Sequence, residues 1–447
     1  MINKLLIANR GEIVSRIIKT CKKMGVQTVA IYSDSDKAAS YLEEADESCC
    51  IGPSNPLKSY LNIDAIINAM LKTRADAVHP GYGFLAENYA FAEAVVSQGA
   101  IWVGPPPSVM KAVESKCYCR QIAAGVDVSV IPGTLSTLAG LKELRQAVQE
   151  YGYPAFLKLD KGGGGKGIEV IRDENQLQEV YERVTRIGQM AFGSSECYLE
   201  VGVERPRHIE IQFIADSFGQ CVCLGERECS VQRRHQKIIE EAPSPVVGEN
   251  ERNTLFAWTR KLSRAMGYEG AGTLEYLRAT GGEFYFMEVN ARLQVEHPVT
   301  EALTGMDIVQ KQLEIASGMP LGLQQDDLQI SGHAIEARVY AEDPDTFQPS
   351  PGKVNRLSFP ATNEHIRIDH ALYEGGTVSP YYDPLIAKVI AWDETRLKAI
   401  QRLTKALREF QVTGIKTTVP LNLHILENKE FQEGNFDTSF LEKFSYK

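Results

Sequence analysis

The sequence has 447 residues, of which 43% are hydrophobic and 24% are charged, and its formal net charge is −10. This composition is typical of a globular protein of two to four packed units, and the acidic balance argues against a nucleic-acid binder. No apolar run is long enough to cross a bilayer, and residues 1–10 have too short an apolar stretch for a signal peptide. The nine cysteines lack the spacing of zinc or redox motifs, so we expect reduced thiols in a cytoplasmic protein that engages no membrane.

The first part of the chain alternates short apolar runs with a helical pattern. Residues 4–8 and 28–32 are typical of buried strands, and residues 12–24 place apolar side chains at helical spacing up to Gly25. Two more strands are expected at 77–79 and 101–104. This βαβ order predicts a Rossmann-like parallel sheet, although the GxGxxG fingerprint of a dinucleotide site is absent.

The character of the sequence changes twice after this first region. From about residue 115 the predicted strands are longer and alternate polar with apolar residues. From residue 332 a further unit begins with a predicted strand at 334–340 and includes an amphipathic helix at about 394–410. The fold class is therefore α/β combined with α+β, in three units: residues 1–114, 115–331 and 332–447.

A β-hairpin is predicted around Gly281-Gly282, because the runs 273–277 and 284–288 on either side are rich in β-forming residues. If the two glycines are the central residues of the turn, Glu275 lies directly opposite Glu288. Two facing carboxylates repel each other, and a divalent cation between them removes that penalty. Oxygen ligands of this kind suit Mg²⁺ held together with nucleotide phosphates.

The polar face of this hairpin continues beyond Glu288 if the chain stays extended, because alternate residues of a strand share a face. Its further members are then Asn290, Arg292, Gln294 and Glu296. A face that combines acids, amides and one cation predicts a chemical centre. The alternative is a solvated strand face.

A glycine-rich loop begins at Gly162, where consecutive glycines expose backbone N–H groups that can approach phosphates closely. It is not a Walker A loop, because Asp160 stands where the first glycine is required and Gly167 where Ser or Thr would bind Mg²⁺. A flexible connector is the alternative, and a loop of this kind could also close over a nucleotide. Three lysines supply positive charge for phosphates: Lys158, Lys161 and Lys166.

Two further predicted strands carry polar faces. In the first, His208, Glu210 and Gln212 alternate with apolar residues. In the second, predicted as one strand at 232–237, the odd positions are all basic or histidine. A dense basic strand in an acidic protein predicts an anionic partner, and an edge strand protected by charge is an equal alternative.

These motifs resemble those of the biotin carboxylases of the ATP-grasp superfamily, along essentially the whole chain. The matching stretches are residues 7–13, 79–88, 232–237, 288–298 and 336–344. The resemblance implies a Rossmann-like N-terminal domain, an ATP-grasp domain with a mobile lid at about 132–203, and a C-terminal biotin carboxylase domain. It implies a ligase that carboxylates biotin on a carrier protein through carboxyphosphate, using ATP, bicarbonate and two Mg²⁺ or Mn²⁺ ions. This reaction is the first half of an acyl-CoA carboxylase, which serves fatty acid synthesis where the acyl-CoA is acetyl-CoA.

The resemblance also assigns roles to individual residues. The metal ligands are Glu275, Glu288 and Asn290, and the bicarbonate pocket is Lys237, Arg292, Gln294 and Val295. Glu296 is the general base, and Tyr82 and Arg338 bind biotin, Arg338 by steadying its enolate. The catalytic set is Glu296, Arg292, Arg338 and Lys237. The nucleotide residues are Lys116, Lys158, Gly164, Gly165, Glu200, Val201, Val203, His208, Gln232, His235, Glu275 and Glu288.

Some positions depart from the pattern of the family or leave alternatives open. Asp160, Lys161 and Lys166 change the glycine loop, and Glu200-Val201 replaces the usual Glu-Lys, so an altered ATP affinity is expected. The chain has no Ala-Met-Lys-Met sequence, so we expect the carrier protein and the carboxyltransferase to be separate chains. A homodimer is expected, although Lys19, Lys22 and Lys23 place it in question. The alternatives are an ATP-grasp ligase that carboxylates another acceptor, such as urea, and a catalytically silent relative.

Overall fold

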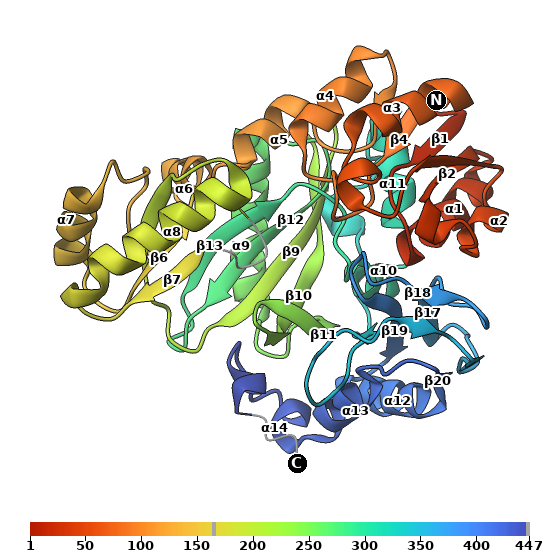
Figure 1. Cartoon of the computed structure of the whole chain (residues 1–447). Coiled ribbons are helices and arrows are strands. Elements are labelled where there is room, and N and C mark those ends of the chain that lie inside the picture. The colour runs from red at the N-terminus through yellow and green to blue at the C-terminus, as the bar shows by residue number, and fades with distance from the viewer. Residues whose placement is uncertain (163–166, 444–447) are drawn as a thin grey trace.

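The computed structural model describes residues 1–162 and 167–443. Its N-terminal region contains a five-stranded parallel sheet (Figure 1). The strands lie in the order β3-β2-β1-β4-β5, and β1 pairs in parallel with both β2 and β4. The predicted Rossmann-like sheet is therefore confirmed. The loops that follow β1 and β4 open on the same crevice, where such sheets place ligands. The strand bounds are β1 (Lys4–Ile7), β2 (Gln27–Ser33), β3 (Glu47–Gly52), β4 (Ala77–His79) and β5 (Ile101–Trp102).

Helix α1 (Glu12–Met24) agrees with the predicted helix at both ends. Its apolar residues, such as Ile13 and Ile17, are buried against the sheet. The helix begins with Glu12 and ends with basic residues, which complements its dipole. Gly25 ends it in the left-handed conformation, with φ of 71°.

One antiparallel sheet of eight strands runs through the central and C-terminal regions. Its order is β13-β12-β9-β10-β11-β14-β19-β17, so β14 of the C-terminal region hydrogen-bonds to β11 of the central region. Residues of both regions therefore face one site. The bounds are β9 (Arg207–Ala215), β10 (Cys221–Arg233), β11 (Gln236–Ala242), β12 (Gly270–Arg278), β13 (Phe284–Asn290), β14 (His333–Tyr340), β17 (Ile366–His370) and β19 (Leu385–Asp393).

The segment predicted as the lid projects from the rest of the molecule as a small α/β unit (Figure 1, left). Its sheet has the order β7-β6-β8, and α7 and α8 pack on it around a separate apolar core that includes Leu144, Leu157 and Val184. The bounds are α7 (Leu141–Tyr151), β6 (Ala155–Leu159), β7 (Ile168–Ile171), α8 (Leu177–Phe192) and β8 (Cys197–Val201). A separate core is what a unit needs to move as a body, so lid closure stays a prediction with a structural basis.

Helices cover the sheets and connect their strands. The predicted helix at about 394–410 is confirmed as α12 (Arg396–Glu409), which packs on β14 and β19. Within residues 1–162 and 167–443, no helix combines the length and the apolar character needed to cross a membrane. The other main helices are α3 (Ile63–Thr73), α4 (Tyr89–Ser97), α5 (Pro107–Val113), α6 (Lys116–Gly125), α9 (Glu249–Met266), α10 (His297–Thr304), α11 (Ile308–Ala316) and α13 (Val419–Glu427).

The hairpin of β12 and β13 has the predicted pairing but not the predicted turn. Gly282 donates its N–H to Ala279 and has φ of 98°, so the turn is a three-residue loop with glycine in its left-handed position. The register then shifts between Tyr276 and Glu275, because Met287 is an extra residue on β13. This bulge restores the pairing of Glu275 with Glu288.

The prediction of one strand at 232–237 is wrong, because this segment is a hairpin turn between β10 and β11. Arg234 and His235 both have positive φ, 48° and 67°, as the two central residues of a two-residue turn. Gln232 consequently pairs with Lys237, and only Lys237 of the basic residues enters the central cluster of charges. Arg234 and His235 are exposed at the turn, and Arg233 pairs instead with Glu342 at 2.9 Å.

Candidate active site

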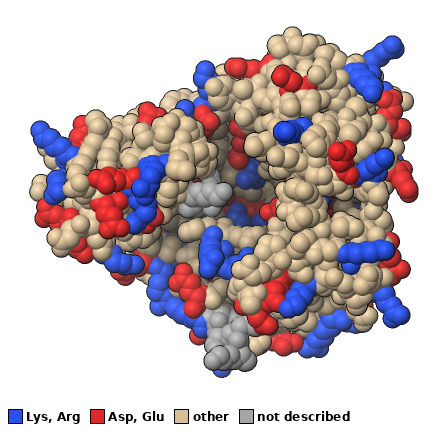
Figure 2. All heavy atoms as spheres, viewed as in Figure 1, with Lys and Arg blue, Asp and Glu red and all other residues tan. Residues whose placement is uncertain are grey.

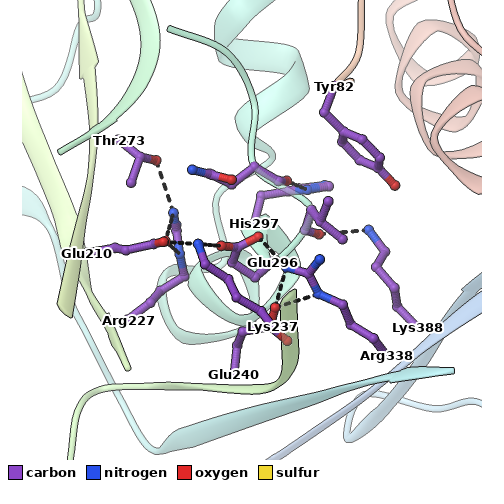
Figure 3. Close-up of polar contacts among 12 residues, drawn as sticks. Tyr82, Glu210, Arg227, Lys237, Glu240, Thr273, Glu296, His297, Arg338 and Lys388 are labelled. Atoms are coloured by element: carbon purple, nitrogen blue, oxygen red, sulfur yellow. Dashed lines mark hydrogen bonds and ion pairs between the residues drawn. The ribbon is translucent and has the colours of Figure 1, made fainter. Parts of the chain in front are cut away.

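A hollow lies between the lid and the rest of the molecule, and charged side chains of both signs are visible inside it (Figure 2). The labelled side chains in Figure 3 come mainly from β9, β10, β11, β12, β14 and β19 and from the segment before α10. Strand β11 belongs to the central region and pairs with β14 of the C-terminal region, so both regions contribute side chains to this site.

Lys237 lies in the middle of this site with its ammonium group among three carboxylates. Its Nζ donates to Glu296 Oε1 at 2.7 Å, lies 3.4 Å from Glu275 Oε1 and also contacts Glu210. Burial alone would lower the pKa of Lys237, but the three carboxylates raise it well above the ordinary value. Lys237 is therefore a fixed positive charge.

Arg227 on β10 supports this cluster from the protein interior and was not predicted as a site residue. It is fully buried and donates to Glu210 Oε2 at 3.1 Å, to Gln212 at 2.8 Å and to Thr273 at 3.0 Å. Glu210 is thus held between Arg227 and Lys237. The predicted polar face of His208, Glu210 and Gln212 is confirmed. It faces Arg227, whose buried position cannot be predicted from the local sequence of β10.

The segment after Asn290 is not the extended strand that was predicted. β13 ends at Asn290, and the chain bends before α10 begins at His297. The predicted side chains nevertheless meet, because Arg292 donates to Asn290 Oδ1 at 3.0 Å and to Gln294 Oε1 at 2.8 Å. Arg292 also pairs with Glu87 at 3.1 Å, a contact from the N-terminal region.

Two buried side chains fix the backbone of this bend. His297 Nδ1 lies 2.7 Å from the carbonyl oxygen of Gln294, and Lys388 Nζ donates to the carbonyl oxygen of Val295 at 2.9 Å. Burial lowers the pKa of His297 well below the ordinary value, so the ring is neutral and its Nδ1–H is the donor. Lys388 also pairs with Glu12 at 3.0 Å, and Tyr82 donates to the same carboxylate.

Glu296 is completely buried between two cations (Figure 3). Its Oε1 accepts from Lys237, and its Oε2 accepts from Arg338 Nη2 at 3.0 Å. Burial raises the pKa of Glu296, but Lys237, Arg338 and Arg227 outweigh this effect and hold it below the ordinary value. Glu296 is therefore ionised and able to accept a proton once an anionic substrate competes for its two cations.

The acids Glu275 and Glu288 lie opposite each other in the hairpin and offer oxygen ligands of the kind that suits a divalent cation. Glu275 is engaged by Asn290 Nδ2 at 2.7 Å and by His208 Nε2 at 2.9 Å. Glu288 has Lys116 at 3.6 Å as its nearest cation, and burial, with Glu275 adding to it, raises its pKa. A divalent cation would favour the ionised form of Glu288, and the oxygens of Glu275, Glu288 and Asn290 would suit Mg²⁺ together with nucleotide phosphates.

Two of the residues predicted to hold the nucleotide, Lys158 and Glu200, lie on strands of the lid. Glu200 is buried on β8 and pairs with Lys158 and with Arg120, the latter at 2.5 Å. Val201 donates its backbone N–H to Pro132 at 2.8 Å, so this group is not available to a ligand. His235 is exposed at its turn, and Val203 follows β8. Gly164 and Gly165 lie outside the described residues.

Family models match three consecutive parts of the chain. Residues 1–110 match the N-terminal domain of biotin carboxylase, residues 115–324 the ATP-binding domain of the carbamoyl-phosphate synthase L chain, and residues 336–443 the C-terminal domain of biotin carboxylase. A Rossmann-like region, an ATP-binding region with facing acids and a shared sheet define an ATP-dependent ligase of the ATP-grasp class.

Relatives that match this chain over nearly its full length identify the family within the ATP-grasp class. The chain is 45% identical to biotin carboxylase 2 of Bacillus subtilis, over 99% of this chain and 100% of that protein. Biotin carboxylase of Campylobacter jejuni has a TM-score of 0.97 at 42% identity, with 99% of each chain covered. The biotin carboxylase domain of Hydrogenobacter thermophilus 2-oxoglutarate carboxylase, a dimer solved with MgADP, ADP and bicarbonate, has a TM-score of 0.95 at 41% identity, covering 99% of this chain and 98% of that one. The chain belongs to the biotin carboxylase family.

Proposed function

We propose that this protein carboxylates biotin on a carrier protein at the expense of ATP, with bicarbonate as the carbon source. The observation that carries the proposal is the position of Glu296 between Lys237 and Arg338, next to Arg292 and the facing acids Glu275 and Glu288. This arrangement offers one base, a set of fixed cations for small anions and a place for a nucleotide with its metal.

In the first step, a bicarbonate oxygen attacks the γ-phosphorus of ATP, the bond to the β-phosphate oxygen breaks and ADP leaves. Arg292 and Lys237 are placed to hold the bicarbonate, and Glu296 accepts its proton. Mg²⁺ at Glu275, Glu288 and Asn290 would neutralise charge on the phosphates. The product is carboxyphosphate.

In the second step, carboxyphosphate breaks down to CO₂ and phosphate, and the ureido nitrogen of biotin loses its proton to the phosphate and bonds to CO₂. Negative charge then develops on the ureido oxygen of biotin. Arg338 supplies the positive partner for this oxygen, and Tyr82 lines the same region from the N-terminal side.

The partners and the location are part of the same proposal. The carrier and the carboxyltransferase are separate chains, and the protein acts in the cytoplasm as a homodimer. The related domain from Hydrogenobacter thermophilus is a dimer, whereas Lys19, Lys22 and Lys23 are exposed on α1 of this chain. That relative belongs to a 2-oxoglutarate carboxylase. The mass of the purified protein in solution tests the dimer.

The activity is tested by measuring ATP hydrolysis with Mg²⁺, with and without bicarbonate and free biotin. We expect ATP hydrolysis to require bicarbonate and to rise with biotin. Glu296→Gln should abolish the hydrolysis, whereas the binding of ATP to this variant should be retained. Free urea and simple amines serve as alternative acceptors in parallel reactions. Stimulation by one of these in place of biotin would refute the proposal in favour of another ATP-grasp ligase.

A further inference from the structure

Glu240 and Glu336 form a buried pair of acids beside Arg338, and neither belongs to the set of residues predicted from the sequence. Glu240 on β11 and Glu336 on β14 are direct partners in the sheet, and both side chains are fully buried. Directly opposed residues share one face of a sheet, and Arg338, two residues after Glu336, lies on that face as well. The pair therefore borders the site from the C-terminal region.

Only one member of this pair holds Arg338. Arg338 Nε donates to Glu240 Oε1 at 2.6 Å, and its Nη2 also lies against Glu240 (Figure 3). Glu336, in contrast, has no hydrogen-bond partner for either oxygen among the residues that the structure describes. Two acids with equal burial on one face thus differ in their contact with the guanidinium group.

Burial disfavours a negative charge on both acids. Burial raises the pKa of Glu336 well above the ordinary value, although Lys388 opposes this. Burial raises the pKa of Glu240 to about 7, and Arg338 opposes this by favouring the ionised form. Arg338 contacts Glu240 and not Glu336, so Glu240 is the acid whose ionised form the guanidinium stabilises.

Arg338 is consequently shared between two acids with different tasks. Its Nη2 reaches Glu296 Oε2 at 3.0 Å, and its Nε edge is held by Glu240. When Glu296 accepts the proton of bicarbonate, it loses its negative charge and its hold on the guanidinium weakens. Glu240 takes no part in that proton transfer and keeps Arg338 in place.

We propose that Glu240 is a positioning residue for the biotin step, because it holds Arg338 through Nε, whereas the contacts of Nη1 with Tyr340 and of Nη2 with Glu296 are ones that the oxygen of biotin can replace. This inference rests on the proposed function. If Glu240 is neutralised, Glu296 becomes the only carboxylate that pairs with Arg338 among the described residues, and the guanidinium moves toward it. The biotin step should suffer more than the formation of carboxyphosphate.

The test compares Glu240→Gln with Glu336→Gln, the matched control on the opposite strand. Bicarbonate-dependent ATP hydrolysis is measured without biotin, and the carboxylation of free biotin with labelled bicarbonate is measured separately. We expect Glu240→Gln to reduce biotin carboxylation roughly tenfold or more, the effect of losing one charged hydrogen bond. The hydrolysis without biotin and the thermal midpoint should change much less, and Glu336→Gln should resemble the unsubstituted protein in both assays.

A double-mutant cycle with Arg338→Lys shows whether Glu240 acts through Arg338. Lysine has no Nε edge for Glu240 to hold, so Glu240→Gln should add little to Arg338→Lys. Independent, multiplicative effects of the two substitutions would overturn the inference, as would equal losses in both assays or an equal effect of Glu336→Gln. If the unsubstituted protein fails to carboxylate biotin, it is the proposed function that fails.

Discussion

Glu275 on β12 lies directly opposite Glu288 on β13, and the bulge at Met287 is what brings the two acids into register. Without this extra residue, the three-residue turn at 280–282 would pair Glu275 with Met287, and Glu288 would point to the other face of the hairpin. A local irregularity in the ladder thus creates the pair of carboxylates that suits a divalent cation.

Glu288→Gln removes one of the charges that suit this cation. We expect the Mg²⁺ concentration for half-maximal ATP hydrolysis to rise roughly tenfold or more, because a charged oxygen ligand is lost. The thermal midpoint without Mg²⁺ should stay the same or rise, since the repulsion from Glu275 is relieved. Glu283→Gln on the same hairpin is exposed and serves as the control. An unchanged Mg²⁺ dependence would exclude Glu288 as a ligand.

Lys388→Met removes a fully buried cation that holds the backbone at Val295. We expect the protein to lose about 3–5 kcal/mol of stability, because Glu12 is left as an uncompensated buried charge. The KM for bicarbonate should rise as well. Combining this change with Glu12→Gln should recover part of the thermal midpoint but not the KM. Recovery of both quantities would mean that Lys388 matters only for stability.

Glycine substitutions test the strain in the turn between β10 and β11. Left-handed conformation costs a non-glycine residue roughly 1–2 kcal/mol, so Arg234→Gly and His235→Gly should each raise the unfolding free energy by about 1 kcal/mol. Only His235→Gly should raise the KM for ATP, because His235 is the predicted nucleotide residue. Equal KM values for the two variants and the unsubstituted protein would remove His235 from the nucleotide site.

Protonation of Glu241 should lower the unfolding free energy of the protein in acid. It is buried, lies 2.6 Å from His333 and accepts two hydrogen bonds from Arg396, at 2.6 and 2.9 Å. Burial raises its pKa, but His333 and Arg396 outweigh this and lower it to about 2. Because the pKa is depressed in the folded state, this stabilisation is complete above the ordinary value of 4.5 and is lost as the pH falls toward 2.

The measurement for Glu241 is the difference in unfolding free energy between the unsubstituted protein and Glu241→Gln. It should be constant from pH 7 to about 5, with an upper limit of about 3 kcal/mol, and should shrink below pH 4.5. The matched control is Glu394→Gln, an exposed residue near the start of α12. A difference that grows as the pH falls would contradict the assigned ion pairs.

The sequence was sufficient for the regular parts of the fold and for the residues that alternate along strands. The bounds of α1 follow from helical spacing and Gly25. The predicted pairing of Glu275 with Glu288 is confirmed, but only because the bulge at Met287 offsets the shift that the three-residue turn introduces. The prediction of an unbroken strand from Glu288 to Glu296 failed because side-chain periodicity does not reveal where β13 ends. The residues still converge, since His297 and Lys388 hold the bend.

The site residues that were not predicted from the sequence cannot be found from local sequence patterns. Arg227 and Lys388 are buried cations whose partners are distant in the chain, so only the tertiary structure assembles them with Glu210 and Val295. Glu240 meets Arg338 only because β11 pairs with β14. The basic run at 232–237 misled the strand prediction, because the turn needs positive φ at two residues that rarely adopt it.

The most direct test of the proposed function is the transfer of label from bicarbonate to free biotin in the presence of MgATP. We predict labelled biotin and one ADP for each carboxylation, with no transfer by Glu296→Gln. A folded protein that binds ATP but transfers no label to biotin, or that labels a different acceptor, would contradict the assignment of this site to biotin carboxylation.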